Sequence, residues 1–268
     1  MAEKLDPKAV PDYFSEAGTV ERWWSPHAGP LAFHYDAELT ILDDHVEVGS
    51  NCRVLDVGTG RGRFAIHFAR QGCQIVAVDI NQEMLEVARE AAEQEGLGSA
   101  IDFREANAED LSEVATNDFD IVLCMELFDH LPDLTKALAS MRSRLDSRGR
   151  FVFTYVPSES IYGFLGNIYR WIRRRWNPKS TMISRTYSLS EVNEALARSG
   201  FELDEYFGVG VLCINAQTRL FQGNLLARLT LFPARAEAKF WPYHSGGVLG
   251  RMGAHVVGVA KPVEGSLP

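Results

Sequence analysis

Three glycines at alternate positions, Gly58, Gly60 and Gly62, follow an apolar run that contains Asp56. Glycine has no Cβ and tolerates φ > 0, so the backbone can turn sharply there and come close to a ligand. The helix expected after this turn presents free N–H groups at its N-terminus, and these attract polar groups of a ligand. The pattern therefore predicts that a nucleotide-like cofactor binds at the carboxyl end of a buried strand.

An acidic residue lies where such a cofactor would place its ribose. Residues 74–78 are apolar and predict the next buried strand, which ends in Asp79. An acidic residue about twenty positions beyond the glycines commonly binds ribose hydroxyls. The dinucleotide pattern G-x-G-x-x-G is not matched, because Arg63 stands where the third glycine should be. Asp56 would also repel a pyrophosphate, whereas its negative charge favours a ligand with an ammonium group.

Residues 55–62 resemble the first motif of the class I S-adenosylmethionine-dependent methyltransferases, and Asp79 lies at the acidic ribose position of that family. The resemblance runs from about residue 50 to the C-terminus, with gaps at 157–185 and 212–250, and points to the small-molecule, ubiquinone/menaquinone-methyltransferase-like superfamily. It implies S-adenosyl-L-methionine as the cofactor and a small-molecule acceptor. The segments that resemble strands three to seven with their loops are 101–111, 119–131, 150–156, 200–203 and 254–260.

The resemblance also implies which residues bind the cofactor. Asn107 lies in the adenine loop at a position often held by Asp, and its amide can still hydrogen-bond the adenine edge. The predicted cofactor-binding residues are Asp56, Gly58, Thr59, Gly60, Gly62, Asp79, Ile80, Met84, Asn107, Ala108, Glu109 and Met125.

Methyl transfer requires mainly that the acceptor atom is held about 3 Å from the methyl carbon and in line with its bond to sulfur. A hydroxyl or a protonated amine also needs a general base. His130 is the predicted base, because its loop borders the methyl group in the resembling family. The alternative is a helix-start histidine bonded to the backbone, with His27, His34 and His244 as rival bases.

Glu126, Asp129 and His130 form an E-x-x-D-H pattern, which is similar to the E-x-x-E-H of some quinone O-methyltransferases. Carboxylates and an imidazole at that spacing can hold a divalent cation. Similar residues occur in many class I methyltransferases that use no metal. We therefore predict no metal, and we expect the two carboxylates to shape the loop and tune the histidine.

The alternation of strand and helix patterns, with the resemblance, predicts a Rossmann-like doubly wound α/β fold. We expect a seven-stranded, mostly parallel sheet with helices on both faces and an antiparallel last strand. The 268 residues, of which 46% are hydrophobic, fit a single methyltransferase domain. Its predicted parts are an N-terminal helical lid (1–48), a cofactor-binding core (49–156), a basic aromatic cap insert after strand five (157–187) and the rest of the sheet with the substrate pocket (188–268).

Two core helices are indicated by their spacing. A capping box from Ser188 to Glu191 predicts the start of one, which ends before Gly200. The other is amphipathic and follows the fourth strand. Its predicted buried residues are Leu131, Leu134, Leu138, Met141 and Leu145.

Three segments lie outside the main resemblance to the family, and we expect them to determine acceptor specificity. The aromatic N-terminus, which includes Phe14 and Tyr35, is either a lid over the cofactor or a helical pair on the sheet edge. Residues 161–176 form a basic, aromatic helix. We favour a cap with apolar residues inward and arginines in water, against contact with an anionic membrane or an acidic group on the substrate. The aromatic residues at 240–244 are expected to complete the acceptor pocket.

Composition limits the partners and the compartment. A net charge of -9 disfavours nucleic-acid binding, which calls for a basic face. The four cysteines are far apart and no secretory leader is recognisable, which favours free thiols in a reducing cytoplasm. No apolar run approaches the roughly 18 residues of a membrane span.

Two other functions compete with methyl transfer: a nicotinamide-dependent oxidoreductase, and a catalytically silent S-adenosylmethionine-binding protein. Thermal unfolding with S-adenosylhomocysteine, NADH or NADPH separates the cofactors. We expect S-adenosylhomocysteine alone to stabilise the fold, by about 2.7 kcal/mol at about a hundred times its Kd. The Asp79→Ala variant should lose this gain. Stabilisation by NADH or NADPH instead would contradict the prediction.

Overall fold

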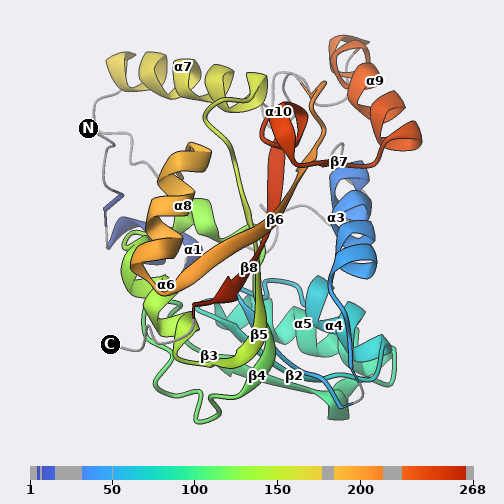
Figure 1. Ribbon diagram of the computed structural model, residues 1–268, viewed down its shortest axis with the longest axis vertical. Coiled ribbons are helices and arrows are strands. Elements are labelled where there is room, and N and C mark those ends of the chain that lie inside the picture. The colour runs from blue at the N-terminus through green and yellow to red at the C-terminus, as the bar shows by residue number, and fades with distance from the viewer. Residues whose placement is uncertain are drawn as a thin grey trace.

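The computed structural model describes residues 5–6, 8–15, 32–49, 51–176, 184–213 and 225–263. Its centre is one sheet with the strand order β3-β2-β1-β4-β5-β8-β6-β7 (Figure 1). The strands are β1 (Arg53–Val57), β2 (Gln74–Asp79), β3 (Ile101–Glu105), β4 (Phe119–Cys124), β5 (Leu145–Tyr155), β6 (Phe201–Val209), β7 (His244–Ser245) and β8 (His255–Pro262).

Strand direction decides which chain segments meet at the site. Neighbours from β3 to β5 pair in parallel, whereas β8 runs antiparallel to both β5 and β6. This confirms the predicted fold class and the antiparallel last strand. Within the described residues the two-residue β7 adds an eighth strand beside β6. Because Tyr155 pairs with Val256, the first residue of β8, His255, lies at the edge where the parallel strands end.

Helices cover both faces of the sheet (Figure 1). On one face α3 (Ala32–His45), α4 (Arg63–Arg70) and α5 (Gln82–Gln94) pack their buried residues on the strands. On the other face α6 (Leu134–Arg142) and α8 (Leu189–Arg198) do the same. The further helices are α1 (Ala9–Ser15), η1 (Gly98–Ala100), η2 (Phe128–His130), α7 (Ile161–Trp176), α9 (Leu225–Phe240) and α10 (Gly247–Gly250).

The strands are apolar on both sides because both sides are covered. In β1, Val54 packs toward α3 and α4, whereas Leu55 and Val57 pack toward α6 and α8. Phe151 on β5 stacks on Phe201 of β6 at 4.8 Å between ring centres, which joins the central strands to the antiparallel end of the sheet.

The predicted capping box is confirmed, and both ends of another predicted helix were wrong. The Ser188 hydroxyl accepts from the Glu191 N–H, while the Glu191 carboxylate accepts from the Ser188 N–H. The helix after the fourth strand was expected to include Leu131 and Leu145, but α6 begins at Leu134 and ends at Arg142. Leu145 instead opens β5 and pairs with Phe119, five residues before the predicted start of that strand. The side chain of Leu145 is buried, as both a helix residue and a strand residue at this position would be. Hydrophobic spacing alone could therefore not distinguish the end of the helix from the start of the strand.

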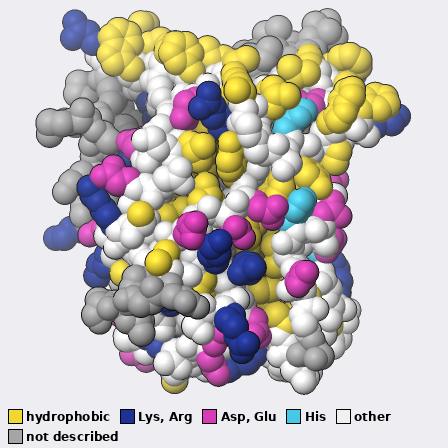
Figure 2. Space-filling view, viewed as in Figure 1, with side chains coloured by type: hydrophobic (Ala, Val, Ile, Leu, Met, Phe, Trp, Pro, Cys, Tyr) yellow, Lys and Arg dark blue, Asp and Glu magenta, His cyan; other side chains and the backbone are white. Residues whose placement is uncertain are grey.

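The expected cap arrangement of α7 was also wrong. Its apolar side chains lie in solvent rather than inward: Trp176 is 86% exposed, Trp171 69% and Phe164 59%. Exposed apolar residues of α9 and α10 continue the same side of the molecule, and Figure 2 shows them together along its top. We call this set the apolar crown; it comprises Ile161, Phe164, Leu165, Ile168, Tyr169, Trp171, Ile172, Trp176, Phe232, Phe240, Trp241, Val248 and Leu249.

The four cysteines are buried and carry free thiols. None of the helices in the described ranges combines the length and the apolar character that crossing a bilayer requires.

Candidate functional site

A cavity of about 220 Å³ opens at the edge where β1, β2 and β4 end. The loops after these three strands form its floor, and α1 contributes from the N-terminal side. Its lining residues are Val10, Phe14, Tyr35, Gly58, Thr59, Gly60, Arg61, Arg63, Phe64, Asp79, Ile80, Asn81, Met84, Ala106, Asn107, Ala108, Met125, Glu126, Leu127, His130, Leu131 and Pro132.

The glycine loop is fixed to the end of β2. The Gly58 N–H donates to the Val78 carbonyl at 2.8 Å, and the Gly60 N–H donates to the Asp79 carboxylate at 2.8 Å. Gly58 has a φ of +75°, which favours glycine, and a Cβ there would lie 2.8 Å from the Cδ2 of Leu127, so glycine lets the two loops pack closely. At Gly60 φ is +54° and the Cβ position is open, which leaves room for a ligand.

Three predicted cofactor residues support the loops and do not line the cavity. Asp56 is buried beneath the glycine loop, where its carboxylate accepts from the Thr59 hydroxyl at 2.7 Å. Burial raises the pKa of Asp56 to about 6. Gly62 is the N-cap of α4, and the Glu109 carboxylate accepts from the Asp133 N–H at 2.9 Å.

The other predicted site residues do line the cavity, His130 included. They are Gly58, Thr59, Gly60, Asp79, Ile80, Met84, Asn107, Ala108, Met125 and His130. Of the rival histidines, His34 and His244 lie outside the lining, and His27 lies outside the described residues. His244 Nε2 lies 2.8 Å from the Glu237 carboxylate, and burial lowers the pKa of His34 to about 3.

Several lining residues were missed by sequence reasoning or were noticed for other reasons. Phe14 and Tyr35 were noted only as aromatic, and Glu126 only for its metal-like spacing. Arg63 was treated as a departure from a glycine pattern. Each of these residues is distant in the chain from other residues that line the cavity. No local sequence pattern therefore indicates that they meet there.

The aromatic residues at 240–244 were wrongly expected to complete the pocket. Phe240 and Trp241 are exposed, and the Tyr243 hydroxyl donates to Asp44 on α3 at 2.8 Å. None of the three lines the cavity.

Arg63 carries an unsatisfied donor at the cavity. Its Nη2 donates to Glu38 at 2.8 Å, and its guanidinium carbon lies 4.1 Å from the Tyr35 ring centre. Its Nη1 is buried without a hydrogen-bond partner among the described residues. Leaving a charged donor unpaired is costly, so this atom fits an anionic group of a ligand.

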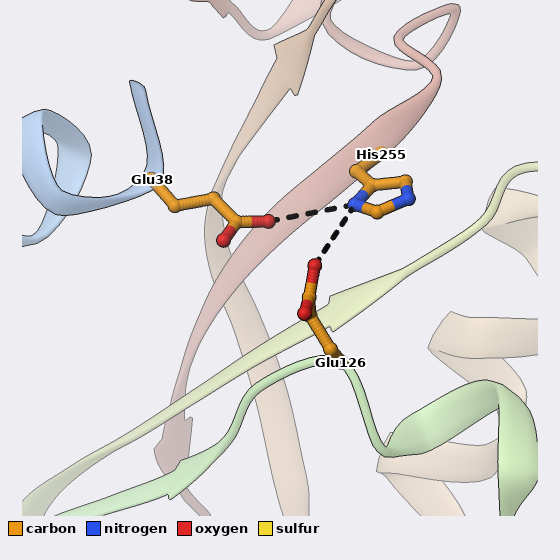
Figure 3. Close-up of side chains that lie close together, drawn as sticks. All are labelled: Glu38, Glu126 and His255. Carbon is orange, nitrogen blue, oxygen red and sulfur yellow. Dashed lines mark hydrogen bonds and ion pairs between the residues drawn. The ribbon is translucent and has the colours of Figure 1, made fainter. Parts of the chain in front are cut away.

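A histidine between two carboxylates lies beside the cavity (Figure 3). The Nδ1 of His255 is 3.5 Å from Glu38 and 3.7 Å from Glu126. Burial, with the nearby Glu38 charge, raises the pKa of Glu126 to about 7. Burial would lower the pKa of His255, but hydrogen bonding to Glu38 and the charge of Glu126 raise it.

The predicted E-x-x-D-H residues do not converge. Both carboxylate oxygens of Asp129 lie 3.0 Å from the Val156 N–H, which turns that side chain to the end of β5. In the described part of the chain, the group whose ligand atoms converge within 4.8 Å is Glu38, Glu126 and His255. Arg63 already neutralises Glu38, so this group does not fit a divalent cation well.

Comparison with known proteins decides the family. A family model described as a methyltransferase domain matches residues 49–217. The chain is a class I S-adenosylmethionine-dependent methyltransferase. S-adenosyl-L-methionine is its methyl donor, and methyl transfer to a small molecule is its reaction. The family membership favours this chemistry over the nicotinamide-dependent alternative.

Two relatives of the methyltransferase share a name. It is 28% identical to the ubiquinone biosynthesis O-methyltransferase of Acinetobacter baylyi over 211 residues, which cover 76% of this chain and 86% of the relative. It is also 28% identical to the protein of that name from Xanthomonas euvesicatoria over 199 residues, 72% of this chain and 81% of the relative.

Solved structures support the fold. Magnesium protoporphyrin IX methyltransferase from Synechocystis, solved with bound S-adenosylhomocysteine, matches with a TM-score of 0.62 and 16% identity over 95% of this chain and 99% of that one. A methyltransferase from Thermotoga maritima, described as a possible histamine N-methyltransferase, gives 0.60 and 21% over the same shares.

The buried carboxyl of Asp129 predicts a pH dependence of stability. Burial raises its pKa to about 7, so the folded protein holds that proton more tightly than the unfolded chain. Its stabilising contribution is therefore present below about pH 4 and is lost as the pH rises through about 7. Asp129→Asn keeps an acceptor for Val156 without the charge.

We expect the difference in unfolding free energy, Asp129→Asn minus wild type, to increase by roughly 1–3 kcal/mol as the pH rises from about 4 to about 8. Guanidinium unfolding at a series of pH values measures it. The exposed Glu113→Gln serves as the control and should show no such trend. A pH-independent difference for Asp129→Asn would contradict the argument.

Proposed function

We propose that the methyltransferase transfers the methyl group to an oxygen or nitrogen of a partly hydrophobic small molecule, by in-line displacement. The observation that carries this proposal is that one cavity joins the glycine loop to the side chains after β4. The glycine loop supplies contacts for a nucleoside, and the side chains after β4 supply apolar walls with a few polar groups. Such a combination is typical of sites for small organic ligands.

The residues present fit S-adenosylmethionine, which supplies an electrophilic methyl group when bound. We propose that the Asp79 carboxylate binds the ribose and that Asn107 and Ala108 border the adenine. Open space at Gly60 admits the ligand close to the backbone. The unpaired Nη1 of Arg63 is placed to bind the carboxylate of the methionine moiety. Asp56 acts indirectly, because it holds the loop from beneath.

The acceptor end is proposed to lie between α1 and the loop after β4. Val10, Phe14, Leu131 and Pro132 give it apolar walls, which suits a ring or another hydrophobic body. The His130 ring packs edge-on against Phe14 at 5.0 Å between centres, and we assign it the role of positioning the acceptor. The relatives named for O-methylation in ubiquinone biosynthesis favour oxygen as the methylated atom.

We propose that the N-terminal segment acts as a lid in this arrangement. The Phe14 carbonyl accepts a hydrogen bond from the Asn81 side chain, which tethers α1 to the loop after β2. A cover at this place would keep water from the reacting groups.

The apolar crown is proposed to rest on an anionic lipid surface. Trp171 and Trp176 on α7 project into solvent beside the exposed Arg175, a composition suited to a membrane interface. The helix also reaches the site, since the Tyr162 ring lies 6.3 Å from that of His255. A lipophilic acceptor could then pass from the lipid to the cavity along α7.

Vesicle flotation tests the lipid contact. We expect Trp171→Ala with Trp176→Ala to weaken binding to both neutral phosphatidylcholine vesicles and vesicles containing phosphatidylglycerol. Arg175→Gln should weaken binding only to the anionic vesicles, by about fivefold, because one basic residue near the surface contributes about 1 kcal/mol. The matched control is Arg198→Gln on α8. Wild-type protein that floats with neither vesicle would refute the contact.

A probe panel tests the acceptor class. Release of S-adenosylhomocysteine is measured with 4-methylcatechol, phenethylamine and benzoate as methyl acceptors. We expect turnover with the hydroxyl or the amine and none with the carboxylate, which is a weak nucleophile and is repelled by the charge of Glu126 in the lining. Protein that binds S-adenosylhomocysteine and methylates only benzoate, or no probe at all, would contradict the proposal.

A further inference from the structure

We propose that Glu126 is the catalytic residue that removes the proton of the acceptor, and that Glu38 and His255 are positioning residues for its carboxylate. The acceptor is accordingly a neutral hydroxyl. This inference rests on the proposed function and deepens it by naming the group that does the proton transfer.

The backbone of Glu126 is held in an unusual conformation. It follows β4 with φ +56°, a left-handed value that is uncommon for residues other than glycine. Its N–H donates to the Thr154 hydroxyl on β5 at 2.5 Å, which fixes the turn. Such strain persists where surrounding structure enforces it, and it concentrates at functional sites. Here it directs the Glu126 side chain toward His255 along the cavity wall (Figure 3).

The network around Glu126 is assembled from elements distant in the chain. Glu38 comes from α3, His255 from the start of β8, and Glu126 from the loop after β4 (Figure 3). The Glu38 side chain is fully buried, and 12% of that of His255 is exposed. The Glu126 side chain is 34% exposed and lines the cavity, so it is the member that a ligand can reach.

Charge pairing leaves Glu126 as the member able to accept a proton. Glu38 is held as a carboxylate, because His255 and Arg63 both hydrogen-bond to it. Arg63 donates to Glu38 and not to Glu126 among the bonds formed by described residues. The titratable or charged groups that face Glu126 come from α3, α4, η2, α7 and β8; they are Tyr35, Glu38, Arg63, Asp129, Tyr162 and His255.

In the proposed step one bond to the methyl carbon forms as another breaks. A lone pair of the acceptor oxygen forms a bond to the methyl carbon, while the bond from that carbon to sulfur breaks and its electron pair stays on sulfur. The hydroxyl proton moves to a carboxylate oxygen of Glu126. The products are a methyl ether, a neutral thioether and a protonated Glu126, whose carboxyl then loses the proton to water.

A neutral hydroxyl fits this site better than an acidic acceptor does. It is a weak nucleophile until its proton leaves, so a base at the cavity wall accelerates its reaction. An anionic acceptor would need no base, and the Glu126 carboxylate would weaken its binding. This assignment replaces the base predicted from the sequence, His130, which also lines the cavity.

Two catechol probes separate proton removal from binding. The hydroxyls of 4-methylcatechol are neutral at mildly alkaline pH, whereas 4-nitrocatechol is already largely ionised there. Turnover of each is measured in wild type and in Glu126→Gln, with the affinity for S-adenosylhomocysteine determined by calorimetry. We expect Glu126→Gln to lower kcat with 4-methylcatechol by about a hundredfold or more and to change kcat with 4-nitrocatechol by less than about tenfold.

The controls address structural damage. Glu237→Gln alters another buried glutamate that contacts a histidine, His244, but lies outside the lining, and it should leave both activities unchanged. Glu126→Asp retains a carboxylate and should recover part of the 4-methylcatechol activity. For the positioning role, His255→Gln should lower kcat with 4-methylcatechol by about tenfold at unchanged KM, while sparing 4-nitrocatechol.

The outcomes separate this inference from the proposed function. Equal loss with both probes in Glu126→Gln, or no loss, would overturn the role of base while methyl transfer to a hydroxyl stands. Wild-type protein that binds S-adenosylhomocysteine but methylates neither catechol would overturn the acceptor class, and the inference with it. Selective loss with 4-methylcatechol at unchanged cofactor affinity supports both.

Discussion

The molecule depends on keeping several acidic side chains out of bulk water at one edge of its sheet. Burial raises the pKa values of most of them, because a desolvated carboxylate is costly. Glu38 differs, since hydrogen bonds from Arg63 and His255 hold its pKa down against burial. This edge therefore concentrates carboxyl groups, and a donor that carries a sulfonium and an ammonium group would favour their charged form. The carboxyls with raised pKa values are Asp56, Asp79, Glu126 and Asp129.

Different strands and helices supply these acidic side chains and the groups that balance their charge. Strands β1, β2 and β4 bring the carboxylates together because they run parallel and end at one edge. Strand β8 runs the other way, so its first residue, His255, can meet them. Helix α3 adds Glu38, and the first turn of α4 adds Arg63. Remote elements thus provide the balancing charges, while the glycine loop provides the space.

The parts of the fold and site that depend on neighbours in the chain could be predicted from the sequence. The glycine loop, Asp79 and the Ser188 capping box are local patterns, and each lies where its spacing indicated. The contact between Glu38 and His255 joins residues 217 positions apart, and no periodicity reports on it. Helix α7 shows the second limit: spacing located the helix, but it could not tell whether its apolar side faces the protein or the solvent.

The close approach of Gly58 to Leu127 has a thermodynamic consequence. Gly58 belongs to the loop proposed to hold the methyl donor, and Leu127 to the loop proposed to border the acceptor; with no Cβ on Gly58, the Leu127 side chain packs directly on the glycine loop. If an acceptor changes the equilibrium of the Leu127 loop, it changes the affinity for the donor, and the donor must change acceptor affinity by the same factor. Any such coupling of the two ligands would pass through a contact that the missing Cβ of Gly58 permits.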